Sequence, residues 1–327
     1  MTTALAMISG GLDSTLAAKL VKDQGIEVIG ICFKSNFFGE KNALKMVKQI
    51  DIPLEVVDFS DKHFEMVKNP KHGYGKNMNP CIDCHAMMMR YCGELLEKFH
   101  ADFIITGEVL NQRPMSQNRS ALDIVKNESG IGHKILRPLC AKNLNPTQME
   151  IDGLINREAL MDIKGRNRKV QMELALKWGI LDYPSPAGGC KLTEPNYSIR
   201  LKDLLENKEN PSKIDLELLK IGRQFRLSKG AKIISTRSEK EGDLLEQFLT
   251  DEDLMFLARD YNGSTVAIIG TATNEDIEFA SKTTGRYCKG RDEKIVSISY
   301  GRDAQNLDQS IEATPATEDE INNYIIN

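Results

Sequence analysis

Residues 1–14 read Met-Thr-Thr-Ala-Leu-Ala-Met-Ile-Ser-Gly-Gly-Leu-Asp-Ser and combine three local signals. The apolar run 1–8 predicts a strand, and the spacing of apolar residues over 15–24 predicts a helix. The two glycines between them predict a tight turn that lets backbone N–H groups approach a ligand closely. Amides at a helix N-terminus bind phosphate, and the hydroxyl groups of Ser9 and Ser14 add donors. The stretch therefore predicts a strand–turn–helix phosphate site.

Strands and helices alternate after this turn. Apolar runs predict strands at 27–33, 53–59 and 102–106, amphipathic patterns predict helices at 41–50 and 84–99, and the polar stretch 64–78 is expected to be a loop. Alternation of this kind predicts an α/β fold, a doubly wound parallel sheet with helices on both faces. Ligands bind beyond the carboxyl ends of such strands, and Ser9, Lys34 and Thr106 fall at strand ends. Three strands therefore point to one crevice.

The length of the chain predicts two domains. Its 327 residues are enough for two hydrophobic cores. We expect a first domain over 1–205, which contains the phosphate site, and a second, smaller α/β domain over 213–302, in which short strands and helices alternate again. Residues 303–327 are polar, and we expect them to form a loosely ordered tail.

Composition excludes several classes of protein. Hydrophobic residues make up 41% and charged residues 28%, as in ordinary soluble domains. A net charge of −4 argues against non-specific nucleic-acid binding but leaves room for a local basic patch. No long uncharged apolar run predicts a membrane span, and no secretory signal is recognised, so a cytoplasmic location is expected. Seven cysteines in a reducing compartment are expected to be thiols, metal ligands or redox groups.

The cysteine pair in Asn-Pro-Cys-Ile-Asp-Cys-His, residues 79–85, is the second strong signal. Cys81 and Cys84 at i and i+3 of a starting helix can present both sulfurs to one partner, and Cys190 is the natural third member. Three readings stay open. The cysteines could hold a 4Fe–4S cluster with one open iron, act as a persulfide pair, or bind zinc with His85 as a fourth ligand.

These motifs resemble a known family in combination. The turn Ser-Gly-Gly-Leu-Asp-Ser resembles the pyrophosphate loop of the PP-loop ATP-pyrophosphatases, whose fold is adenine nucleotide alpha hydrolase-like. Together with the later cysteines it resembles the tRNA thiolases, over about residues 1–200. The segment 106–117, Thr-Gly-Glu-Val-Leu-Asn-Gln-Arg-Pro-Met-Ser-Gln, resembles 4-thiouridine synthases, whereas the Asn-Pro-Cys segment is closer to 2-thiouridine synthases. The second domain, between 223–226 and 286–288, resembles the small RNA-binding module of the NFACT proteins.

The resemblance implies an adenylation site and a sulfur site. ATP and Mg²⁺ would bind at the turn, with Asp13 as a catalytic residue toward the metal, and a uridine carbonyl would be adenylated. Sulfur held by the catalytic cysteines Cys81, Cys84 and Cys190 would then displace AMP. The ATP-binding residues expected are Ser9, Gly10, Gly11, Asp13, Ser14, Phe33, Lys34, Thr106, Gly107 and Glu108. The candidate contacts to RNA phosphates are Lys142, Arg166, Arg168 and Lys169.

Several features stay open at this point. Thiolation at the 4-oxygen is favoured because 106–117 is longer and more distinctive than the cysteine motif. The expected partners are tRNA, a sulfur donor (free sulfide or a cysteine desulfurase) and, in a homodimer, a second copy of the chain; no membrane partner is expected. One rival is a PP-loop enzyme that adenylates a small-molecule carbonyl, with the cysteines holding structural zinc. Another is an RNA-binding protein without catalysis.

Overall fold

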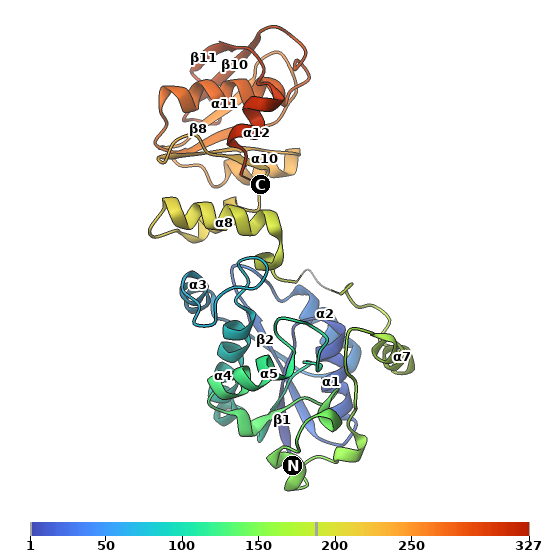
Figure 1. Ribbon diagram of the computed structural model, residues 1–327. Coiled ribbons are helices and arrows are strands. Elements are labelled where there is room, and N and C mark those ends of the chain that lie inside the picture. Colours follow the sequence, from blue (N-terminus) through green and yellow to red (C-terminus); the bar gives the residue numbers. More distant parts are fainter. Residues whose placement is uncertain (1, 187–188, 327) are drawn as a thin grey trace. The chain divides into compact units, whose positions relative to one another are not determined.

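The computed structural model describes residues 2–186 and 189–326. The chain divides into two compact units, residues 1–193 and 194–327 (Figure 1). Each unit has its own sheet and its own hydrophobic core.

The first unit is built on a five-stranded sheet whose strand order is β3-β2-β1-β4-β5. Every pairing in it is parallel, as the sequence predicts. The order reverses at β1, which lies between β2 and β4, so the carboxyl end of β1 is the topological switch point where open α/β sheets bind ligands. The strands are β1 (Thr3–Met7), β2 (Glu27–Lys34), β3 (Leu54–Asp58), β4 (Phe103–Ile105) and β5 (Ile135–Leu136).

Helices cover both faces of this sheet, which confirms the doubly wound fold. Figure 1 shows α1 and α2 on one side and α4 and α5 on the other. Buried apolar residues of α1 and α2 share one core, and those of α4 share the other. The helices of this unit are α1 (Leu12–Lys22), α2 (Lys41–Ile50), α3 (Ser60–Lys68), α4 (Cys81–Lys98), α5 (Arg119–Glu128), α6 (Gln148–Ile151) and α7 (Lys169–Lys177). Short 3₁₀ turns lie at Gly132–Lys134, Ala141–Asn143, Arg157–Ala159 and Lys191–Thr193.

Helix α3 corrects one expectation. The polar stretch 64–78 was expected to be a loop throughout, but its first residues complete a helix that begins at Ser60. The helix forms because Phe64 and Val67 lie on one face together with His63, and all three are buried. Only the part after Lys68 is irregular, with turns around Gly73 and Gly75.

The second unit is an antiparallel α/β structure. Its six-stranded sheet has the order β11-β10-β8-β9-β7-β6, and helix α11 packs on it through Phe279 and Ala280. The ring of Phe279 contacts that of Phe225 at a centroid distance of 5.8 Å. The elements are α8 (Pro195–Asn207), α9 (Lys213–Leu218), β6 (Arg223–Phe225), β7 (Ala231–Ser235), α10 (Glu239–Glu246), β8 (Leu254–Ala258), β9 (Val266–Gly270), α11 (Asn274–Arg286), β10 (Val296–Gly301), β11 (Gln309–Ala313) and α12 (Glu318–Tyr324).

The units divide at residues 193 and 194, earlier than the expected end of the first domain at residue 205. Helix α8 belongs to the second unit because two of its polar side chains form hydrogen bonds with residues of that unit. The buried guanidinium of Arg200 donates hydrogen bonds to the carbonyl oxygens of Leu219 and Gly222, both at 3.0 Å. Asp203 accepts two hydrogen bonds from Arg226, at 2.6 and 2.9 Å. The sequence before residue 205 gave no sign of these long-range partners.

The segment 303–327, expected to be a loosely ordered tail, contains two regular elements. Strand β11 pairs antiparallel with β10, and helix α12 buries Ile321 in the core of the unit. The backbone N–H of Ile326 donates to the carbonyl oxygen of Gln224 at 2.8 Å. The segment reads as polar because β11 lies at the edge of the sheet and its residues are mostly exposed.

Among the described residues, no helix combines the length and the apolar character that crossing a membrane requires.

Candidate functional site

The turn between β1 and α1 is tightly packed. Gly10 has a φ of +78°, and a Cβ there would lie 2.6 Å from atoms of Asn42 and Ala43. Only glycine fits this position without strain. The hydroxyl groups of Ser9 and Ser14 are 3.2 Å apart, and Ser14 Oγ donates to the carbonyl oxygen of Gly11 at 3.0 Å. Residues 9–14 therefore form one ordered loop at the switch point of the sheet.

The segment after β4 lies directly against this loop. A Cβ on Gly107 would lie 2.4 Å from the backbone N of Ser14 and 2.5 Å from its Cα. The segment is fixed internally, because Thr106 Oγ1 accepts from the backbone N–H of Glu108 at 3.0 Å. The structure thus brings Thr106, Gly107 and Glu108 together with residues 9–14, which the sequence predicts to bind phosphate and which are called the phosphate loop below.

Glu108 is held in a buried ion pair. Its carboxylate accepts a hydrogen bond from Arg137 Nε at 2.8 Å and lies 3.1 Å from His85 Nδ1. Burial by itself raises the pKa of this carboxyl, but the Arg137 guanidinium and His85 outweigh burial and lower the pKa to about 2. Glu108 therefore stays ionised and joins the loop after β4 to helix α4. Arg137, which the sequence analysis missed, follows β5 directly and lacks a local motif that would identify it.

The two carboxylate oxygens of Asp13 differ in their hydrogen bonding among the described residues. Its Oδ2 accepts a hydrogen bond from Gln112 Nε2 at 2.6 Å. Its Oδ1 is buried and has no hydrogen-bond partner among the described residues. A carboxylate oxygen of this kind beside a phosphate loop fits the oxygen-rich coordination that Mg²⁺ prefers. The residues present therefore fit a magnesium ion at Asp13.

The two residues at the end of β2 differ in their surroundings. The side chain of Phe33 is buried and packs against the rings of Phe59 and Tyr91, at centroid distances of 5.2 and 6.3 Å. Phe33 thus contributes its side chain to the core. Lys34 is partly exposed at the strand end, with its Nζ 3.8 Å from a carboxylate oxygen of Glu40.

The three cysteines singled out by the sequence lie near one another at the start of α4. Cys84 is buried, and burial raises the pKa of its thiol well above the usual range; the nearby sulfurs of Cys190 and Cys81 raise it further. Cys81 is more accessible, and its sulfur accepts a hydrogen bond from Asn79 Nδ2 at 3.2 Å. Cys190 is also partly exposed. The fold therefore gathers residues that are far apart in sequence.

A buried histidine that the sequence analysis missed contacts this group. His63 Nε2, on helix α3, is 3.2 Å from Cys84 Sγ. Its ring stacks on Phe59 at 4.8 Å, and burial lowers the pKa of the imidazole to about 4. His63 is therefore neutral at physiological pH. The helical spacing of Ser60, Phe64 and Val67 was the one signal that could have placed it on a buried face.

The histidine and the acidic groups around the cysteines have partners within the first unit. Within residues 2–186 and 189–326, no three or more histidine, cysteine, aspartate and glutamate side chains form a group that could hold a metal ion. His85, considered as a fourth zinc ligand, has its Nδ1 3.1 Å from Glu108 Oε1. Cys84 has His63 as its hydrogen-bond partner. The 4Fe–4S cluster and the zinc site at Cys81, Cys84 and Cys190 stay predictions.

The expected RNA contacts divide into two groups. Arg166, Arg168 and Lys169 lie in the basic segment 164–169, which is anchored to Leu110 by a bridge to Lys164 and by a 2.8 Å hydrogen bond from the backbone N–H of Gly165. This segment therefore lies beside the loop after β4. Lys142 is held separately, because its Nζ donates to the carbonyl oxygen of Glu158 at 2.8 Å.

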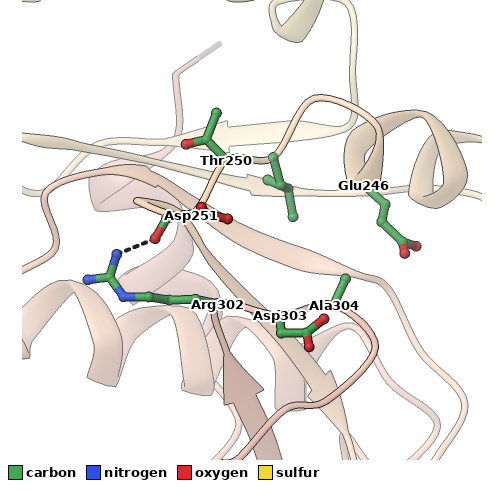
Figure 2. Close-up of a pocket in the computed structure, with 7 residues that line it drawn as sticks. Glu246, Thr250, Asp251, Arg302, Asp303 and Ala304 are labelled. Carbon is green, nitrogen blue, oxygen red and sulfur yellow. Dashed lines mark hydrogen bonds between the residues drawn. The ribbon is translucent and has the colours of Figure 1, made fainter.

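A depression on the second unit has a different character. Figure 2 shows residues that line it, from α10 to the turn after β10, and its volume is about 480 Å³. Arg302 donates to the carbonyl oxygen of Asp251 at 2.6 Å, so its charge is partly committed. Three of the lining side chains are the carboxylates of Glu246, Asp251 and Asp303. Such a lining repels phosphate and does not favour an RNA backbone.

Two family models match this chain, one in each unit. Residues 1–146 match the family model described as thiamine biosynthesis protein (ThiI). This part of the first unit is therefore similar to the ThiI family. Residues 222–325 match the NFACT protein RNA binding domain. Both resemblances inferred from the sequence are thereby confirmed.

Curated relatives match only part of the chain. A tRNA-specific 2-thiouridylase MnmA 1 from Clostridium botulinum (strain Okra) is 31% identical over 122 residues, covering 32% of this chain and 33% of that protein. The MnmA of Clostridium acetobutylicum is 35% identical over 121 residues, covering 31% and 34%. The chain thus spans about a third of the length of these relatives.

One solved structure is a 4-thiouridine synthetase–RNA complex with bound ATP. It is 14% identical, covers 55% of this chain and 52% of its own, and has a TM-score of 0.36. This likeness is too weak to carry an argument about function.

Proposed function

We propose that this protein thiolates a uridine of tRNA and uses ATP to activate the uracil carbonyl. The observation that carries the proposal is the link between the phosphate loop and the cysteines. Gly107 lies against Ser14 of the loop, and Glu108 next to it binds His85, the neighbour of Cys84. The match of residues 1–146 to the ThiI family model and the tRNA-specific enzymes among the relatives of the chain support the same activity.

The first step forms an adenylate. The backbone amides and serine hydroxyls of residues 9–14 hold the phosphates of ATP, and Lys34 and Thr106 border the site. Mg²⁺ held by Asp13 would neutralise charge on the departing pyrophosphate. The uracil carbonyl oxygen attacks the α-phosphorus, the bond to the β-phosphate oxygen breaks, and pyrophosphate leaves. The carbonyl oxygen has then become part of a good leaving group, AMP.

The second step replaces oxygen with sulfur. We assign the accessible Cys81 as the carrier of a persulfide, which a donor of the cysteine-desulfurase class, or sulfide with an oxidant, would load. The terminal sulfur attacks the activated ring carbon and AMP leaves, so the base is joined to the cysteine by a disulfide. A second thiolate, from Cys84 or Cys190, attacks the sulfur of Cys81. This forms a cysteine disulfide and releases the thiolated base, and a cellular thiol reduces the disulfide.

RNA would be bound by both units. Arg166, Arg168 and Lys169 lie near the adenylation site, and Lys142 adds a further positive charge. The NFACT-type domain supplies a second grip on tRNA. An acidic protein can bind RNA in this way because local basic segments, and not the net charge, face the phosphates.

The choice of carbonyl separates two candidates. We favour the 4-oxygen, because the segment 106–117 is the more distinctive motif and the ThiI family model matches the domain that contains it. Thiolation at the 2-oxygen is the second candidate, since the curated relatives are named tRNA-specific 2-thiouridylases.

Nucleoside analysis of bulk tRNA tests the proposal. Deleting the gene in a host without a redundant enzyme should remove one thiolated uridine from the profile, 4-thiouridine on the favoured assignment. Loss of 2-thiouridine would move the reaction to the other carbonyl. An unchanged profile would overturn the RNA reaction and favour a small-molecule substrate.

A further inference from the structure

Asp13 stands at the end of a chain of amide side chains. Its Oδ2 accepts from Gln112 Nε2 at 2.6 Å, and Gln112 Oε1 accepts from Gln171 Nε2 at 2.9 Å. Gln112 belongs to the loop after β4, and Gln171 belongs to helix α7. Two hydrogen bonds thus join three segments that are distant in sequence.

Gln171 is an unusual residue for its position. Its side chain is fully buried, whereas its neighbours Val170 and Met172 are exposed. Helix α7 packs on α1, the helix that carries Asp13 at its start. An apolar residue would fill this position without the cost of removing an amide from water. The buried amide therefore has a polar task, and its observed partner is Gln112.

We propose that Gln112 and Gln171 are positioning residues that fix the orientation of the Asp13 carboxylate toward bound Mg²⁺ and the phosphates of ATP. This inference rests on the proposed function. A carboxylate with one oxygen held by a strong donor can present its other oxygen in a single direction. Here the presented atom is Oδ1, which is buried and without a partner among the described residues. The Asp13 carboxylate can only accept, so Gln112 turns Nε2 toward it, and the Gln171 N–H then holds Gln112 Oε1 from the other side.

The basic segment 164–169 holds this arrangement in register. It joins the loop after β4 through Leu110, and Gln171 follows it on the first turn of α7. The loop after β4 and the segment that leads into α7 are therefore joined at two points. One is the backbone hydrogen bond from Gly165 to Leu110, and the other is the side-chain hydrogen bond from Gln171 to Gln112. The amide chain is accordingly a preorganised support for Asp13.

The test uses the full chain with Gln112→Met and Gln171→Met, which keep side-chain length but remove the amide, and the double variant. Formation of AMP from ATP is measured with tRNA present. Gln148→Met is the matched control, since Gln148 is exposed and donates to Asp152 at 2.7 Å on helix α6. Urea midpoints establish that each variant is folded.

If Gln171 acts on Asp13 only through Gln112, removing both amides should have no more effect than removing that of Gln112. Gln112→Met should lower kcat/KM for ATP about tenfold, as expected for one lost bond to a charged group. Gln171→Met should lower kcat/KM by less, and the double variant should equal Gln112→Met alone. Gln148→Met should match the wild type. Additive losses in the double variant would show two separate packing roles and overturn the proposal.

A binding measurement separates this proposal from the proposed function. The gain in ATP affinity on adding Mg²⁺ is compared calorimetrically in the wild type, Asp13→Asn and Gln112→Met. The proposal predicts that the gain in Gln112→Met falls most of the way to that in Asp13→Asn. If Mg²⁺ raises the ATP affinity of Gln112→Met as much as that of the wild type, the proposal is overturned, whatever the rate of AMP formation. Absence of AMP formation by the wild type with tRNA would instead overturn the proposed function.

Discussion

The phosphate loop and the cysteine group are built in opposite ways. The loop is made by neighbours in sequence: two glycines and two serines between one strand and one helix, with hydrogen bonds among themselves. The cysteine group is made by segments that meet only in the folded unit, since Cys84 has His63 from another helix and Cys190 from beyond α7 beside it. Local sequence therefore specifies the first region, and tertiary packing specifies the second.

The largest effect should come from breaking the local region. Gly10→Ala places a methyl group 2.6 Å from Asn42 and Ala43 at a φ of +78°. Strain and overpacking together should lower the free energy of unfolding by roughly 3 kcal/mol, measured by urea denaturation. Gly25→Ala is the control, because Gly25 has a φ of +80° but open space around it. It should cost only about 1 kcal/mol. Equal losses in the two variants would mean that the loop is not tightly packed.

Acid should weaken the cysteine region through His63. Burial lowers the pKa of this imidazole from 6.5 to about 4, so the unfolded chain binds its proton first as the pH falls. The stabilising contribution is therefore complete above pH 6.5 and is lost between 6.5 and 4, at roughly 3 kcal/mol in total.

Urea unfolding at several pH values measures this loss. His63→Phe, which suits the surrounding rings, should remove this part of the pH dependence, and the exposed His133→Phe should leave it intact. Glu108 contributes in a separate window, because its pKa is lowered to about 2 and its contribution is lost below pH 4.5. An unchanged profile in His63→Phe would contradict a buried neutral histidine beside Cys84.

The sequence predicts the regions that are built from neighbouring residues better than those that are built from distant segments. The parallel sheet, the loop 9–14 and its contact with 106–108 depend on local patterns and on the meeting of strand ends, so they were predictable. The pairing of Glu108 with Arg137 was not, because the arginine comes from the end of another strand. Contact between Glu108 and ATP stays a prediction. Gln171 and His63 were missed for the same reason, since burial of a polar side chain is decided by its distant partner.

Thiol reactivity sharpens the contrast within the cysteine group. Cys84 is buried and the pKa of its thiol is raised, whereas Cys81 is more accessible and hydrogen-bonded to Asn79. Alkylation by iodoacetamide at pH 7.5 should modify Cys81 at least about tenfold faster than Cys84, followed by mass spectrometry of peptides. Full denaturation in urea is the control and should equalise the two rates. Faster modification of Cys84 in the native protein would reverse the assignment of carrier and resolving thiols.

The smallest effect concerns the basic segment. Replacing Arg166 or Lys169 by alanine should weaken tRNA binding only several-fold at moderate salt. Each change should reduce the slope of log affinity against log salt by about one. Lys220→Ala is a control on the second unit, because Lys220 is already paired with Glu217. A salt slope unchanged by the first two substitutions would place the RNA elsewhere.

Thiolation in a purified system tests the central claim most directly. The full chain is incubated with unmodified tRNA, ATP, Mg²⁺, a persulfide donor and a thiol reductant, and digested nucleosides are resolved by liquid chromatography and mass spectrometry. Iron and zinc in the same preparation are measured in parallel. The account predicts one AMP for each thiolated uridine, with 4-thiouridine as the product and no stoichiometric metal on the cysteines. No thiolated uridine under these conditions would contradict it, and four irons per chain would contradict the persulfide route.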